Sequence, residues 1–74
     1  MLRTLRKNRG FTQAELAKRS GISQSYISDL EKDYFVYSPT VRQIIALSNA
    51  LDADIVELFM YFAKKEMEYN VNRC

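Results

Sequence analysis

The sequence contains no histidine, one cysteine, one proline and two glycines among its 74 residues. Histidine is the commonest general base and metal ligand, so its absence argues against catalysis and against a histidine-bound metal. The single cysteine, Cys74, excludes an internal disulfide and a cage of cysteine ligands. The sequence also shows no catalytic triad and no pair of catalytic carboxylates. We therefore expect no enzyme, no metal, no cofactor and no small-molecule ligand.

Long hydrophobic runs are missing as well. No apolar run approaches the ~20 residues that cross a membrane, and the chain does not open with a signal peptide. We therefore expect a cytoplasmic protein without a membrane partner. A chain of this length forms one small domain that buries about 60% of its unfolded surface. Leu, Ile and Ala recur at helical spacing and no segment alternates as a strand does, so the expected fold class is all-α.

The most informative stretch is residues 12–32, TQAELAKRSGISQSYISDLEK. It predicts two short helices separated by a sharp turn. Thr12 and Glu15 form the pattern of a capping box at the start of the first helix. Gly21 can take the left-handed conformation that ends this helix, and Ser23 can cap the next one. The stretch is therefore predicted to be a helix-turn-helix.

The second of these helices, predicted over residues 24–32, has two different sides. Tyr26, Ile27 and Leu30 share an apolar side that can pack on a core. The opposite side carries short hydrogen-bonding groups instead of long charged ones, which is typical of a helix that recognises a ligand. These polar residues are Gln24, Ser25, Ser28 and Asp29.

The pattern Q-A-E-L-A-x-x-S-G-I-S-Q-S-Y-I-S-x-L-E resembles the helix-turn-helix of the Cro and phage-repressor family of bacterial regulators, often called XRE. The resemblance covers roughly residues 2–59. The matching positions are Gln13, Glu15, Leu16, Ala17, Gly21, Ser23, Ile27 and Glu31. It implies a five-helix bundle of the lambda-repressor-like DNA-binding type. It also implies a regulator, with repression favoured, that binds specific double-stranded DNA as a homodimer.

The charge distribution agrees with a nucleic-acid partner. Residues 1–33 carry seven Lys and Arg against four acidic residues, a net charge of +3. Residues 34–74 carry four against five, a net charge of −1. The basic half contains the predicted helix-turn-helix, as a phosphate-binding surface requires.

The predicted mechanism is base reading in the major groove. Gln24 can donate and accept at once, which suits the edge of adenine. Asp29 is open between accepting from a cytosine amine and a structural role, and Tyr26 between the DNA backbone and the bundle interior. The resemblance implies that Gln13 bonds a phosphate and braces the recognition helix. The expected DNA-binding residues are Gln13, Ser23, Gln24, Ser25, Tyr26, Ser28, Asp29 and Lys32.

The resemblance further implies an ion pair between Arg6 and Glu31 that supports the fold and does not contact DNA. The alternative for Arg6 is an ordinary solvated charge.

The remaining helices are predicted from caps and spacing. The first spans residues 2–9. Ser38 and Pro39 are expected to start the fourth, and Asp54 the fifth. The domain is expected to end at residue 69, followed by a frayed tail over residues 70–74. The expected core stripes are Val41, Ile44, Ile45, Ser48 and Leu51 on the fourth helix, and Ile55, Leu58, Phe59 and Phe62 on the fifth.

Two apolar features remain unassigned by this scheme. The aromatic loop over residues 33–38 carries four bulky residues, Tyr34, Phe35, Val36 and Tyr37. Either one or two of them cover the core, or some stay exposed and contact a partner subunit or the DNA backbone. A second stripe on the fifth helix is formed by Val56, Met60, Ala63 and Met67. It predicts a dimer interface, and the alternative is that the loop over residues 33–38 encloses it. The alternative function is an interaction module, or an antitoxin-like protein that binds its partner through this helix. The sequence leaves open whether the context is a phage repressor, a restriction–modification controller or an antitoxin.

Overall fold

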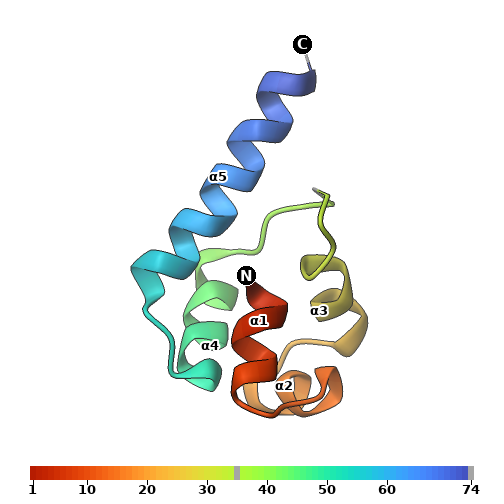
Figure 1. Cartoon of the computed structure of the whole chain (residues 1–74), viewed down its shortest axis with the longest axis vertical. Helices are drawn as coiled ribbons and strands as arrows, with labels where there is room; N and C mark the ends of the chain where they lie inside the picture. The colour runs from red at the N-terminus through yellow and green to blue at the C-terminus, as the bar shows by residue number, and fades with distance from the viewer. Residues whose placement is uncertain (35, 74) are drawn as a thin grey trace.

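The computed structural model describes residues 1–34 and 36–73, with side chains as far as Asn70. The described part of the chain is helical and contains no strand, which confirms the all-α prediction. Figure 1 shows five helices in sequence order. They are α1 (Leu2–Asn8), α2 (Gln13–Ser20), α3 (Gln24–Leu30), α4 (Val41–Leu51) and α5 (Ile55–Arg73).

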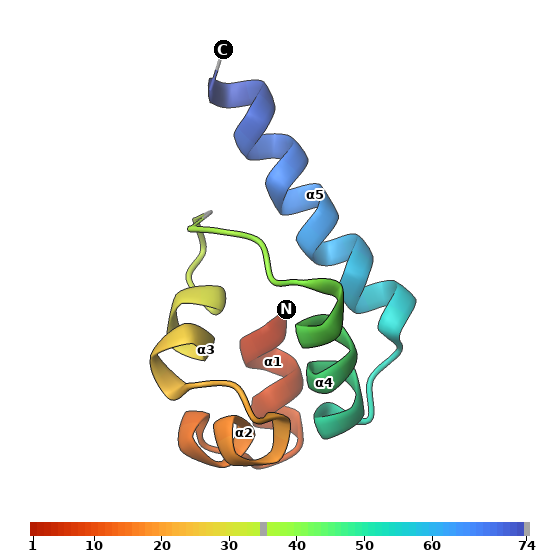
Figure 2. The same ribbon diagram turned by 180° about the vertical axis from the view of Figure 1, so that it is seen from behind.

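The first four helices form a bundle, and α5 packs along α4 and extends past the bundle (Figures 1 and 2). Every helix contributes to one hydrophobic core. Each large side chain buried there contributes about 1.5–3 kcal/mol to stability, so a domain this small depends on all of them. The core residues are Leu2, Leu16, Ile22, Ile27, Leu30, Ile44, Leu47, Leu51, Leu58 and Phe62.

The helix-turn-helix has the caps that the sequence predicts. The Thr12 hydroxyl accepts a hydrogen bond from the Glu15 backbone N–H, and the Glu15 carboxylate accepts one from the Thr12 N–H. Gly21 ends α2 with φ of 73°, a value that glycine adopts without strain. Ser23 then caps α3 by accepting from the Tyr26 N–H. The turn angle between α2 and α3 is thereby set by local chemistry.

The predicted start of α4 was wrong. The N-cap is Thr40, whose hydroxyl accepts from the Gln43 N–H, while the Gln43 side chain accepts from the Thr40 N–H. This reciprocal box satisfies two N–H groups that a Ser38 cap would leave open. Ser38 instead donates to Glu66 on α5, and Pro39 is buried before the helix begins.

The predicted core stripes were partly wrong. On α4, Val41 and Ile45 are exposed, and Leu47 is buried in their place. On α5, Ile55 and Phe59 are exposed. On each of these two helices, the apolar residues are spaced so that either of two neighbouring sides could face the core. Packing of α4 against both α2 and α5 selects one side only.

The ends of three helices also differ from the boundaries predicted from the sequence. The last residue of α1 is Asn8 and that of α3 is Leu30, each followed by one C-cap residue. The helical conformation of α5 continues through Arg73, past residue 69 and into the stretch expected to fray, and Cys74 lies outside the described residues. Among the described residues, no helix has the length and apolar character needed to cross a membrane.

Candidate nucleic-acid interface

The outward side of α3 presents polar groups that the protein itself does not use. Gln24 and Ser25 are exposed and Ser28 is half-buried. Within residues 1–34 and 36–70, where side chains are described, those of these three residues make no hydrogen bond. We refer to Gln24, Ser25 and Ser28 as the reading face. Its donors and acceptors are available to a ligand.

Asp29, the fourth polar residue of this helix side, is occupied inside the protein. One carboxylate oxygen accepts a 2.8 Å hydrogen bond from the Tyr37 hydroxyl, and the other lies 3.0 Å from the Lys32 ammonium. The hydrogen bond from Lys32, followed by that from Tyr37, lowers the pKa of Asp29. The geometry therefore supports the structural alternative for Asp29 over cytosine reading.

Tyr37 explains part of the aromatic loop. Its ring packs against Tyr26 with 4.7 Å between ring centroids, and it covers the core from the loop side. Tyr34 and Val36 are exposed, and Phe35 lies outside the described residues. The Lys32 ammonium lies 5.7 Å from the centroid of the Tyr34 ring. Tyr37 thus covers part of the core, while Tyr34 remains at the surface beside the Lys32 ammonium.

The hydrogen bond to Asp29 has a measurable consequence. Burial, and then this bond, raise the pKa of Tyr37 to about 12. A raised tyrosine pKa adds stability that is complete below the ordinary value of 10.0 and is lost as the pH rises toward 12. We expect an absorbance titration to show one tyrosine with a pKa of about 12 that Tyr37→Phe removes and Asp29→Asn shifts to lower pH. A tyrosine that still titrates near pH 12 in Tyr37→Phe would contradict the assignment.

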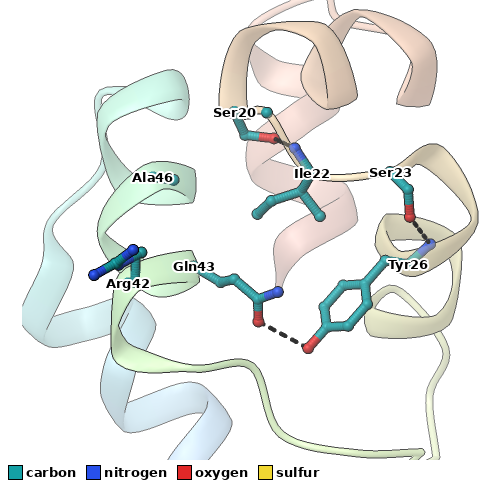
Figure 3. Close-up of a pocket in the computed structure, with 8 residues that line it drawn as sticks. Ser20, Ile22, Ser23, Tyr26, Arg42, Gln43 and Ala46 are labelled. Atoms are coloured by element: carbon teal, nitrogen blue, oxygen red, sulfur yellow. Dashed lines mark hydrogen bonds between the residues drawn. The ribbon is translucent and has the colours of Figure 1, made fainter.

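Tyr26 is hydrogen-bonded to α4 inside the bundle. Its hydroxyl donates a 2.8 Å hydrogen bond to the Gln43 side-chain oxygen, and burial raises the pKa of Tyr26. Figure 3 shows the two side chains pointing toward one another between α3 and α4. The sequence analysis missed Gln43. Its signal was the T-x-x-Q pattern at residues 40–43, a capping box of the kind recognised at Thr12.

A buried ion pair between Arg6 of α1 and Glu31, the C-cap residue of α3, joins these two helices. The Arg6 Nε lies 2.6 Å from Glu31 Oε2, and the Arg6 Nη2 lies 3.1 Å from Glu31 Oε1. A third Arg6 nitrogen donates to the Phe11 carbonyl. The Gln13 side-chain amide donates to Glu31 Oε1 at 3.0 Å, so this oxygen accepts from both Arg6 and Gln13. Burial would raise the pKa of Glu31, but the bonds from Arg6 and Gln13 outweigh it and lower the pKa.

The residues expected at a dimer interface lie on the outer side of α5. Met60 and Met67 are 49% and 66% exposed, Val56 is exposed and Ala63 is half-buried. Phe59, which the sequence analysis placed in the core, is also exposed. Tyr61 lies on a different side of the helix and packs against the core. The described part of the chain contains no cluster of three or more metal-binding side chains.

The fold and sequence are similar to those of a solved structure. The crystal structure of the restriction-modification controller protein C.AhdI from Aeromonas hydrophila matches with a TM-score of 0.69 and 35% sequence identity. The match covers 77% of this chain and 83% of that one. At this identity the similarity extends from the fold to the sequence.

Comparison of sequences gives the same result. An uncharacterized HTH-type transcriptional regulator, y4dJ, from Sinorhizobium fredii is 44% identical over 73% of this chain and 68% of its own length. The immunity repressor protein of Bacillus phage phi105 is 29% identical over 93% of this chain, which spans about half of the repressor, 49%. A family model described as helix-turn-helix matches residues 2–58. The chain belongs to the XRE-type helix-turn-helix family of DNA-binding transcriptional regulators.

Proposed function

We propose that the protein binds a specific double-stranded DNA sequence as a homodimer, with α3 in the major groove, and represses transcription by occupying a promoter. The observation that carries the proposal is the reading face. Gln24, Ser25 and Ser28 keep free hydrogen-bonding groups, whereas Asp29 and Tyr26 are bonded inside the protein. Free polar groups on an outward helix are what base recognition requires.

The base contacts follow from the chemistry of the reading face. Gln24 lies in the first turn of α3, and in this family's docking geometry the first turn approaches base edges. Its amide can bond adenine in the bidentate manner, and the two serines can meet donors or acceptors. Lys32 flanks the helix on the basic half of the chain and would contact phosphate.

Dimerisation is supported by the outer side of α5. A short helix such as α3 gives few base contacts, and two copies would read two half-sites about 34 Å apart on one side of the duplex. Val56, Phe59, Met60 and Met67 place four exposed apolar side chains on one helix. Burying them against a second copy would remove this surface from water. A different protein partner on this helix would instead give a complex of another mass.

The proposal is tested by selecting bound sequences from a pool of random duplexes and then measuring affinity against salt. We expect enrichment of a two-fold symmetric site. The logarithm of affinity should fall linearly with the logarithm of salt concentration, with a slope of about −0.9 for each phosphate neutralised. Selection without enrichment, or affinity that ignores salt, would contradict the proposal. Analytical ultracentrifugation of the free protein separates a homodimer from a monomer.

Base contacts and backbone contacts can be separated with two substitutions. Gln24→Ala is expected to weaken binding to the selected site by about 1–3 kcal/mol and to change binding to random DNA little. Lys32→Ala should weaken both about equally, because phosphates carry no sequence information. Fluorescence anisotropy measures the affinity of each variant for the selected duplex and for a random one. Equal losses for Gln24→Ala on the two duplexes would assign Gln24 to the backbone.

A further inference from the structure

The C-terminal end of α3 is held by a side chain from another helix. The last turn of α3 contains no basic residue of its own. The Lys65 ammonium, from α5, donates to the Lys32 carbonyl at 2.7 Å and approaches the Leu30 carbonyl at 3.4 Å. The Leu30 carbonyl is the last of α3 and lacks an intrahelical partner, while Lys32 lies two residues past the helix. A cation at this end also complements the helix dipole. Lys65 thus provides the C-terminal cation that α3 lacks.

Lys65 differs from an ordinary surface lysine. It is half-buried, and its ammonium lies 5.5 Å from the centroid of the Tyr61 ring, which itself packs against the core. Burial lowers the pKa of Lys65, while the charge of Asp33 acts in the opposite direction. The preceding residue, Lys64, is exposed. The two adjacent lysines therefore form a natural pair for comparison, with one charge each and different surroundings.

The neighbouring residue of α5 holds the other end of the same segment. Glu66 accepts a 2.6 Å hydrogen bond from Ser38, just before α4. The segment between α3 and α4 thus contacts α5 near both of its ends. In both views, residues 36–40 run from the α3 side of the molecule toward α5 (Figures 1 and 2). Between these ends, Tyr37 bonds Asp29 of α3. Two sets of contacts therefore link α5 to α3. Lys65 reaches the end of α3 directly, and Glu66 acts through the loop that carries Ser38 and Tyr37.

We propose that Lys65 is a positioning residue for DNA recognition: by holding the carbonyl end of α3, it fixes the orientation of the reading face relative to α5. This inference rests on the proposed function, in which α3 enters the major groove and α5 joins the two copies. An α3 that pivots relative to α5 would misplace both reading faces relative to their half-sites. Lys65 itself does not contact DNA in this scheme.

The test compares Lys65→Met with Lys64→Met in the full chain, since each removes one positive charge from α5. We expect Lys65→Met to bind the selected duplex about tenfold more weakly, with little change on random DNA and the same dimer mass. Lys64→Met should stay close to the wild type on both duplexes. Lys65→Arg should restore most of the affinity, because its guanidinium can donate to the same carbonyls. Equal losses on both duplexes, or identical behaviour of the two Met variants, would overturn the proposal.

A measurement without DNA keeps the inference separate from the proposed function. By nuclear magnetic resonance of the wild type, the Lys65 ammonium protons should exchange with water more slowly than those of Lys64. Equal exchange rates would overturn the role of Lys65 even if Lys65→Met failed to fold. If the wild type enriched no duplex, the proposed function would fail instead, and slow exchange at Lys65 would still establish its hold on α3.

Discussion

Met60→Glu combined with Met67→Lys is expected to give a folded monomer whose affinity for the selected site is about a hundredfold to ten-thousandfold lower, because joining two reading units gains a factor of this size. Both side chains are exposed on α5, so the substitutions leave the core intact. Glu and Lys are good helix formers and preserve α5. Charges placed in an apolar interface without partners oppose association strongly. Analytical ultracentrifugation and circular dichroism measure the two expected properties.

The control for this pair is Glu57→Lys combined with Lys64→Glu. These positions are both exposed on α5, have the same spacing of seven residues and also leave the net charge unchanged. They flank Met60 at the edge of the apolar stripe, and each position already carries a charge, so this variant should remain a dimer and bind DNA like the wild type. A Met60→Glu, Met67→Lys variant that stays dimeric would move the interface away from this stripe, with exposed Tyr34 and Val36 as the next candidates.

Removing either partner of the Arg6–Glu31 pair is expected to lower the free energy of unfolding by about 3–5 kcal/mol, because the other charge stays buried without its closest ion partner. The Glu31 side chain is 0% exposed and the Arg6 side chain 10%. The total free energy of unfolding of a small domain is only about 5–15 kcal/mol, so Glu31→Ala should be partly unfolded near its working temperature. Chemical denaturation of Arg6→Ala, Glu31→Ala and the double variant measures the loss and the coupling.

Arg3→Ala is the matched control. Arg3 also lies near Glu31, at 3.6 Å, but its side chain is 56% exposed, so its loss should cost under about 1 kcal/mol. Negligible coupling between Arg6 and Glu31 in the double variant would show that the pair does not stabilise the fold.

The same pair predicts a response to acid. Because the pKa of Glu31 is lowered in the folded protein, its contribution is complete above the ordinary value of 4.5 and is lost as the pH falls through the lowered value. Glu31→Gln should flatten this part of the stability profile.

The local rules of the sequence predicted the helix-turn-helix well. Thr12, Glu15, Gly21 and Ser23 act on neighbours within three or four residues, so their roles can be derived without tertiary contacts. The Arg6–Glu31 pair joins residues far apart in the sequence, and only the resemblance to a family suggested it.

Other parts depended on packing that the sequence does not display. Ser38 and Thr40 both offer an acceptable cap, and the choice is made by Gln43, which closes a box on Thr40 and holds Tyr26 at the same time. The side of α5 that carries Phe59 looks like core by spacing, but the bundle is too small to cover it. The occupation of Asp29 required knowing where Tyr37 folds back.

Glu31 follows the last turn of α3, yet it is bound by Arg6 of α1 and Gln13 of α2. Three helices therefore share one carboxylate, and α3 has little freedom to rotate relative to α1 and α2. The ordering entropy of α3 is then lost during folding, and little of it remains to be lost when the proposed DNA complex forms. Association should consequently resemble the docking of a rigid body, with a rate governed by electrostatic steering and with little further gain of helical structure on the duplex.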